Sequence, residues 1–266
     1  MPGLALCHDV ISMSKIILER QGRISRITID GPEKRNSMSR TSAAELRDAL
    51  VSAAGDESRV IVLTGAGDYF CSGADLSTHN GTDVSDYVRQ VVNPIILTIR
   101  EMKKPVIARV HGPAMGLGCN LALACDIVIA SADAQFGQMF VRVALMPDGG
   151  GTFFLPRVMG HSRAFEWLTT GNAIDAKAAL DLGLINSVLP FKKLDAGIEE
   201  TAERLASGPP LVIAGIKQAL AYSQSHTLAE CLEFEAAHQK ECFESEDFLE
   251  GRAAFLAKRK PEFKGV

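Results

Sequence analysis

The stretch 111–131 reads HGPAMGLGCNLALACDIVIAS, and the stretch 134–160 reads AQFGQMFVRVALMPDGGGTFFLPRVMG. The apolar run 105–110 before His111 suits a buried strand, and the glycines after it open a helix of small residues. A strand that ends in glycines and opens a helix leaves backbone N–H groups free at the positive end of the helix dipole. Such a place binds an anion or stabilises a developing oxyanion, so this stretch is the first place to look for function.

The rest of the chain alternates short apolar runs with stretches of helical spacing. This alternation through the first half indicates parallel β-α-β units, whereas the second half is mostly helical. We expect a loose leader at 1–14, a core at 15–200 and a helical C-terminal region at 201–266. Strands are predicted at 15–20, 23–29, 59–64, 105–110, 126–130 and 184–189. Helices are predicted at 39–54, 83–102, 152–159, 162–169, 175–182, 194–206, 209–223, 227–243 and 247–258.

The composition argues against several classes of protein. The chain has 266 residues and a formal net charge of −4, so a basic surface for nucleic acid is not expected. Its apolar runs are too short to span a bilayer, and its start resembles neither a secretory nor a transit signal. We therefore expect a cytoplasmic protein that does not contact membranes. Its six cysteines form no C-x-x-C pair and no metal-ligand cluster is recognisable, so reduced thiols and no metal are expected.

Two glycine-bearing turns, Cys71–Asp75 and Ala114–Gly118, each follow an apolar strand. If the two strands are neighbours, one N–H from each turn can converge on a single oxygen, as a carbonyl that becomes an enolate requires. Ordinary strand-to-helix turns are an equally good interpretation of the pattern alone. Neither turn carries G-x-G-x-x-G, and the chain has no G-x-x-x-x-G-K-[ST], so a dinucleotide or P-loop site is disfavoured.

Asp148 stands between a proline and three glycines. An aspartate in such a turn usually caps the next helix, and the residues alone favour this interpretation over a catalytic one. His111 and His161 are expected to be structural. His79 lies in a loop from which it could reach a ligand, although exposure to solvent is favoured. Cys71 and its neighbour lack the nucleophile elbow and the partner order of a catalytic triad.

Several ordered blocks of the sequence together form a family signature. They are Arg35–Asn36, Cys71–Leu76, Val110–Cys119, Cys125–Ala130, Ala134–Gly137, Gly149–Thr152, Ala176–Leu184 and Phe255–Phe263. With these blocks nearly the whole chain resembles the crotonase superfamily, the enoyl-CoA hydratase/isomerase family. The resemblance implies an α/β fold, a spiral of ββα units with a helical C-terminal region that forms a homotrimer or a dimer of trimers. It also implies an acyl-CoA substrate, no cofactor beyond the coenzyme A of that substrate, and an oxyanion hole made by the N–H groups of Ala74 and Leu117.

The sequence departs from the family's hydratases at the two positions that matter most. Those enzymes carry one glutamate after the G-x-G-C block and another after the Q-F-G-x block, where this chain has Asn120 and Phe140. Addition of water needs two positioned groups, so the departure argues against an efficient hydratase. Isomerases of the family place an acidic residue at the position that matches Asp148. The segment Leu145–Val158 is most similar to the phenylacetate-type isomerases.

The resemblance therefore favours an enoyl-CoA isomerase in which Asp148 is the single acid and base. The residues expected to contact the substrate are Cys71, Gly73, Asp75, Leu76, Gly116, Asn120 and Phe140. Three alternatives stay open: a hydratase of the same family, a hydrolase or dehalogenase with Asp148 as nucleophile and His79 as base, and an acyl-CoA-binding protein without catalysis. In the tail, Lys258, Lys260 and Phe263 either contact the nucleotide end of coenzyme A or are solvated.

Overall fold

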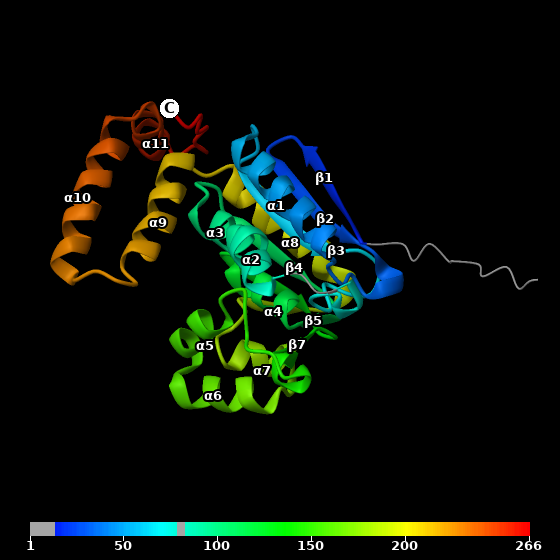
Figure 1. Ribbon diagram of the computed structural model, residues 1–266. Coiled ribbons are helices and arrows are strands. Elements are labelled where there is room, and N and C mark those ends of the chain that lie inside the picture. Colours follow the sequence, from blue (N-terminus) through cyan, green and yellow to red (C-terminus); the bar gives the residue numbers. More distant parts are fainter. Residues whose placement is uncertain (1–13, 79–82) are drawn as a thin grey trace, which may run out of the picture.

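The computed structural model describes residues 14–78 and 83–266 and is built on a six-stranded sheet (Figure 1). The strand order is β1-β2-β3-β4-β6-β9, in which β1 and β2 form an antiparallel hairpin and every other neighbouring pair is parallel. These strands confirm the predicted alternation, with small shifts at their ends. Their bounds are β1 (Lys15–Gln21), β2 (Ile24–Asp30), β3 (Val60–Gly65), β4 (Val106–Val110), β6 (Ile127–Ser131) and β9 (Ser187–Leu189).

A second sheet of three short strands lies at the ends of the large sheet's strands, and the sequence pattern does not predict it. In the order β5-β7-β8, the first pair is parallel and the second antiparallel. Each strand has three residues, too few to show a period of two. Single bridges between Cys71 and Ala114 and between Met38 and Ala74 continue this sheet toward the loop after β3. The strands are β5 (Pro113–Met115), β7 (Gln135–Gly137) and β8 (Ala173–Asp175).

Helices cover both faces of the large sheet, which is why its central strands are mostly apolar. Alternate residues of β3 join two separate core clusters: Ile61 packs in the cluster with α1, and Val62 in the cluster with α8. Ser39 caps α1 by accepting a hydrogen bond from the Ser42 amide. The helices around this core are α1 (Arg40–Gly55), α2 (Val84–Tyr87), α3 (Asn93–Glu101), α4 (Leu117–Ala124), α5 (Gly151–Met159), α6 (His161–Thr170), α7 (Ala176–Asp181) and α8 (Phe191–Ala206).

The predicted helix at 83–102 is continuous but not uniform. A π-helical turn, Val88–Val92, joins α2 to α3 and rotates the faces of the two segments relative to each other. The buried positions Tyr87 and Val92 lie at the two ends of this turn. The π turn therefore lets residues on both sides of it point into the molecule.

Three helices form an arm that projects from the core in Figure 1: α9 (Pro210–Tyr222), α10 (Leu228–Glu244) and α11 (Glu246–Ala257). The division expected between residues 200 and 201 falls inside α8, which stays on the large sheet as far as Ala206. The arm is fastened to the core by Lys217, whose buried ammonium donates to the carbonyls of Ile99 (2.7 Å) and Lys104 (3.0 Å). It also pairs with the Asp126 carboxylate at 2.7 Å.

The last residues return from the arm to the core. The Arg59 guanidinium, just before β3, donates to the carbonyls of Phe263 and Lys264 at 2.9 Å each. Asp247 in α11 accepts hydrogen bonds from the amides of Lys264 (2.6 Å) and Gly265 (2.9 Å). The tail is therefore held from both sides, although whether its other residues contact coenzyme A stays a prediction.

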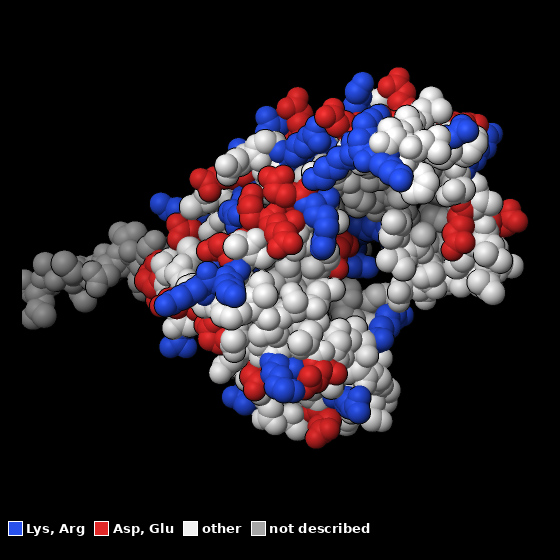
Figure 2. Space-filling model, turned by 180° about the vertical axis from the view of Figure 1, so that it is seen from behind, with Lys and Arg blue, Asp and Glu red and all other residues white. Residues whose placement is uncertain are grey.

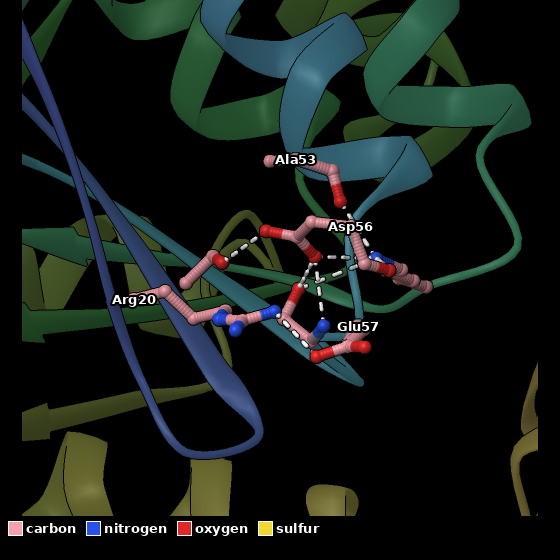
Figure 3. Close-up of polar contacts among 7 residues, drawn as sticks. Arg20, Ala53, Asp56 and Glu57 are labelled. Carbon is pink, nitrogen blue, oxygen red and sulfur yellow. Dashed lines mark hydrogen bonds and ion pairs between the residues drawn. The ribbon is translucent and has the colours of Figure 1, made fainter.

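A polar cluster around Asp56 fixes the end of α1 against the sheet (Figure 3). The Asp56 carboxylate accepts hydrogen bonds from Lys104 and Ser25 at 2.7 Å and from the Ser58 hydroxyl at 2.5 Å. Burial raises the pKa of Asp56, but these hydrogen bonds outweigh it and hold the pKa well below its ordinary value. The exposed Arg20–Glu57 pair beside it, at 3.0 Å, contributes little because both partners are solvated.

At the start of the described chain, Ser14 is buried and donates to the Ser37 carbonyl at 2.7 Å. It therefore belongs to the fold, whereas residues 1–13 of the expected leader lie outside the described residues. In the part of the chain that the structure describes, no helix has both the length and the apolar character needed to cross a membrane.

Candidate active site

The loop after β3 is shaped by Asn36, a fully buried residue with a left-handed backbone (φ 55°). Its side-chain amide donates to the carbonyls of Ala66 (2.8 Å) and Tyr69 (2.5 Å), and its oxygen accepts from the Gly31 amide at 2.9 Å. These bonds satisfy a loop that would otherwise bury unpaired carbonyls. Asn36 is part of a family block in the sequence, but its clamping role is visible only in the structure.

The two glycine-bearing turns lie against each other, because β3 and β4 are neighbours in the sheet. A Cβ on Gly73 would come within 2.8 Å of the Met115 carbonyl oxygen and 3.5 Å of the Leu117 amide nitrogen. A Cβ on Gly118 would come within 2.2 Å of the Cys71 carbonyl oxygen. Only glycine permits this approach of one backbone to the other. The two strands before the turns are therefore neighbours, which is the condition for one N–H group from each turn to converge on a single oxygen.

The two amides predicted to form the oxyanion hole belong to Ala74 and Leu117. Met38 donates to the Gly73 carbonyl and accepts from the Asp75 amide, both at 2.8 Å, so the Ala74 N–H points away from Met38. Leu117 is the first residue of α4, where an amide has no acceptor within its own helix. Gly116 before it has φ 53° and ψ −120°, a conformation that glycine alone adopts readily.

Asp148 is held by Asn120, which reaches it from α4. The Asn120 side-chain amide donates to the Asp148 carbonyl at 2.6 Å, and its oxygen accepts from Gln138 at 2.8 Å. Gly149 and Gly151 leave room for this contact, since a Cβ on either would lie 2.8–3.3 Å from atoms of Asn120. Gly150, not Asp148, occupies the cap position of α5, so the helix-cap interpretation of Asp148 does not hold.

Two residues expected to touch the substrate lie beneath the site instead. Asn120 is fully buried and both ends of its amide bind protein groups, the nitrogen the Asp148 carbonyl and the oxygen the Gln138 side chain. Cys71 is also fully buried; its amide donates to the Pro113 carbonyl and its carbonyl accepts from the Met115 amide. Burial raises the pKa of the Cys71 thiol to about 12, which excludes a thiolate nucleophile at neutral pH.

The other expected contact residues are distributed around the turns. Phe140 packs over Gly116, with ring atoms 3.7–3.8 Å from where a Cβ on that glycine would lie, and forms an apolar wall. Leu76 is 50% exposed and begins a short 3₁₀ turn, Leu76–Thr78. Asp75 pairs with Lys34 at 3.1 Å. Burial raises the Asp75 pKa, but hydrogen bonds from Ser77 and Lys34 lower it by a larger amount. The net pKa is therefore below its ordinary value, and the carboxylate stays ionised.

Two residues near Asp148 carry no signal in the sequence. Tyr87, in α2, is 6% exposed, and burial and then the negative charge of Asp148 raise its pKa to about 12. The guanidinium of Arg40, at the start of α1, lies over the Tyr87 ring at 4.6 Å from its centroid. The tyrosine therefore stays protonated, and a guanidinium cation lies over its ring.

The histidines agree with their structural interpretation where they are described. Arg109 donates to Nδ1 of His111 at 2.7 Å, which leaves Nε2 to donate to the Gly67 carbonyl at 2.8 Å. Burial and then the Arg109 charge lower the His111 pKa, so the ring is neutral. His161 stacks on Phe165 in α6. His79 lies outside the described residues, and no metal-binding group of histidine, cysteine or carboxylate side chains occurs among residues 14–78 and 83–266.

Known proteins resemble this chain in both sequence and structure. The family model described as enoyl-CoA hydratase/isomerase matches residues 19–266. A probable enoyl-CoA hydratase of Rhodobacter capsulatus is 42% identical over 90% of this chain and 93% of its own length. The 1,2-epoxyphenylacetyl-CoA isomerase of Escherichia coli is 36% identical over 95% and 99%. The crystal structure of an enoyl-CoA hydratase from Bacillus anthracis superposes with a TM-score of 0.89 at 33% identity, over 95% of this chain and all of the other.

Proposed function

Because the chain belongs to the enoyl-CoA hydratase/isomerase family, we propose that it is an enoyl-CoA isomerase with Asp148 as its single acid and base. The proposal rests on one observation: neither side chain at the two positions of the hydratase glutamates can activate a water molecule or donate a proton. Asn120 is buried and fully engaged, and Phe140 is an apolar wall over Gly116. The 36% identity to an isomerase of the phenylacetate type adds to this support.

The proposed reaction moves the double bond of a 3-enoyl-CoA to the 2-position. The thioester oxygen accepts hydrogen bonds from the amides of Ala74 and Leu117, which stabilise the dienolate as it forms. The Asp148 carboxylate removes a proton from C2, the electrons shift toward C4, and the same carboxyl group returns the proton there. Atoms and charge balance without a redox partner or a metal, so the proposal requires no resident cofactor.

The residues expected to contact the substrate have different roles in this reaction. Phe140 and Leu76 would border the acyl group, while Gly73 and Gly116 let the backbone approach the thioester. The apolar wall excludes water from the site, which disfavours addition of water to C3 of the 2-enoyl product. Asp75 stays outside this chemistry because its carboxylate is bound to Lys34 and Ser77.

A paired assay tests the proposal. The purified protein is given a 3-enoyl-CoA and, separately, a 2-enoyl-CoA, and the absorbance of the conjugated thioester is followed. We expect the conjugated thioester to appear from the first substrate and to persist with the second. Asp148→Asn should abolish the migration while acyl-CoA binding survives, since the amide preserves the shape of the side chain.

A hydratase of the same family is the second candidate, because the R. capsulatus relative carries that name at 42% identity. Rapid loss of the conjugated thioester in the second assay would favour it and would overturn the isomerase proposal. If neither substrate reacts but an acyl-CoA binds, the chain either acts on a more specialised acyl-CoA or binds acyl-CoA without catalysis.

We also propose that the chain assembles through its C-terminal arm as a homotrimer or a dimer of trimers. None of the residues of α10 is buried, and apolar side chains on the arm face solvent, namely Ile216, Leu220, Leu228, Leu232 and Phe243. On the face of the arm that Figure 2 shows, uncharged side chains outnumber charged ones. Contiguous apolar patches of this kind usually mark an interface.

Light scattering on the purified protein tests the assembly. A mass near three or six times 28.6 kDa is expected, and a monomeric mass would contradict it. The cytoplasmic location stays part of the proposal and can be checked by cell fractionation.

A further inference from the structure

The carboxylate of Asp75 belongs to the residue next to one of the two predicted oxyanion donors. Asp75 follows Ala74 directly, so their Cα atoms are about 3.8 Å apart, and the carboxylate lies on the order of 10 Å from an oxygen bound to the Ala74 amide. Its side chain is only 11% exposed. A negative charge at this distance opposes the negative charge that develops on the thioester oxygen. An ionised aspartate is therefore an unfavourable neighbour for an oxyanion hole unless a cation neutralises it.

Lys34 supplies such a cation from a separate part of the chain. Its Nζ atom lies 3.1 Å from Oδ2 of Asp75, and its side chain is 22% exposed, so solvent screens the pair only in part. The other carboxylate oxygen, Oδ1, accepts from the amide (3.0 Å) and the hydroxyl (2.5 Å) of Ser77. The hydrogen bonds from Ser77 orient the carboxylate, whereas the lysine also balances its charge.

The backbone around Lys34 is bound to the same turn independently of this ion pair. The segment Pro32–Lys34 forms a 3₁₀ turn, and the Arg35 carbonyl after it accepts from the Ser72 amide at 3.0 Å. Met38 forms hydrogen bonds of 2.8 Å with the residues before and after Ala74. We therefore expect the Ala74 amide to stay in place when the ion pair is removed, so that the effect of the charge can be measured separately.

We propose that Lys34 supports the oxyanion hole by neutralising Asp75, so that the developing dienolate meets no unpaired carboxylate beside the Ala74 amide. Lys34 acts through Asp75 and is a positioning residue, not a catalytic one. The inference rests on the proposed function only for the oxyanion hole formed by Ala74 and Leu117. It holds for any acyl-CoA reaction that passes through an enolate at this place.

A double-mutant cycle of Lys34→Met and Asp75→Asn tests the proposal. A unit charge about 10 Å away, at an effective dielectric constant of about 20–40, changes a rate by about 4- to 16-fold. Lys34→Met should lower kcat for a 3-enoyl-CoA by about that factor and change KM by less than about twofold, because the charge on the substrate develops only in the transition state. In the Asp75→Asn background the same lysine substitution should change kcat by less than about twofold. Asparagine keeps an oxygen that can accept from Ser77 and removes the charge.

A purely structural ion pair gives a different pattern. In that case Asp75→Asn lowers kcat as much as Lys34→Met does, and the double variant is no better than either, which would overturn the proposal. An unchanged kcat in Lys34→Met would also overturn it. Arg20→Met is the control for loss of a cation, because its exposed partner Glu57 precedes β3 whereas the site follows that strand.

An infrared measurement separates failure of this inference from failure of the proposed reaction. Hexanoyl-CoA with an isotopically labelled thioester carbonyl has no double bond to move, so its carbonyl stretching frequency reports how strongly the bound carbonyl is polarised. We expect this frequency to rise in Lys34→Met toward that of the free thioester, and to return in the double variant. Equal frequencies in the wild type and Lys34→Met would overturn the inference, whether or not any enoyl-CoA reacts.

Free coenzyme A tests for a direct contact between Lys34 and the carrier. Calorimetry should give the same affinity for free coenzyme A in the wild type and in Lys34→Met, within about twofold. If the variant weakens free coenzyme A by as much as it lowers kcat/KM, the lysine binds a phosphate of the carrier and the proposal is wrong. Circular dichroism and thermal unfolding of each variant confirm that it folds.

Discussion

Replacing Asn120 by alanine tests whether Asp148 is held in place by the helix beneath it. The change removes two hydrogen bonds, one to the Asp148 carbonyl at 2.6 Å and one from Gln138 at 2.8 Å. Two buried polar groups lose their partner, at about 1–3 kcal/mol each, so a loss of about 2–6 kcal/mol of unfolding free energy is expected. A carboxylate displaced by about 1 Å costs about 10²-fold in rate, so kcat should fall by about that factor while KM changes little.

The assay is the migration of the 3-enoyl double bond, combined with urea unfolding of the same preparations. Gln138→Met is the matched control, because it removes the outer hydrogen bond and leaves the contact between Asn120 and Asp148. It should lose stability but keep kcat within a few-fold of the wild type. If Asn120→Ala unfolds more easily yet retains full kcat, or if both variants lose kcat equally, the positioning role is refuted.

Three further predictions concern stability and reactivity. Lys217→Met should lower the unfolding free energy by about 3–5 kcal/mol in urea, because it leaves the partly buried Asp126 without its closest cation and removes the donor to two carbonyls. A loss under about 1 kcal/mol would contradict this. The Asp56 carboxyl has a lowered pKa in the folded protein, so the stability it contributes is complete above about pH 4 and is lost as the pH falls further. Asp56→Asn should therefore be less stable at pH 7, and its unfolding free energy should fall less steeply in acid. If the unfolding free energies of variant and wild type run parallel with pH, this assignment is wrong. The Cys71 thiol should resist a thiol reagent at pH 8 until the protein unfolds, as measured by mass spectrometry; rapid labelling of the native protein would disprove its burial.

The parts of the fold visible in the sequence are those with long, uniform patterns. β3, β4 and β6 are short apolar runs because both faces of the sheet are covered, and the C-terminal helices show regular spacing and cap residues such as Thr227. The second sheet is not visible, since strands such as Pro113–Met115 are three residues long and are fixed by tertiary contacts. The π turn at Val88–Val92 likewise leaves no distinct pattern.

Some residues of the candidate site are likewise visible in the sequence, and others are not. The two glycine turns and Asp148 stand out because glycines and prolines restrict the backbone locally. Asn120 is visible as a departure from the family, but its role depends on a contact with a residue 28 positions later. Arg40 and Tyr87 come from different helices and meet only in the folded chain, so neither position has a local feature that marks it. Residue chemistry is predictable from sequence where the backbone itself is constrained, and much less so elsewhere.

The clasp between Arg59 and the C-terminal tail has a consequence for the order of events during synthesis. Its two ends, Arg59 and Phe263, are separated by 204 residues. At about 5–20 residues per second, the arginine is added to the chain about 10–40 s before its partner. During that interval the guanidinium just before β3 is hydrated, and the sheet forms without the contact. The clasp therefore closes after the sheet, and a chain that stops short of residue 263 has its core but lacks the contact that locks the arm.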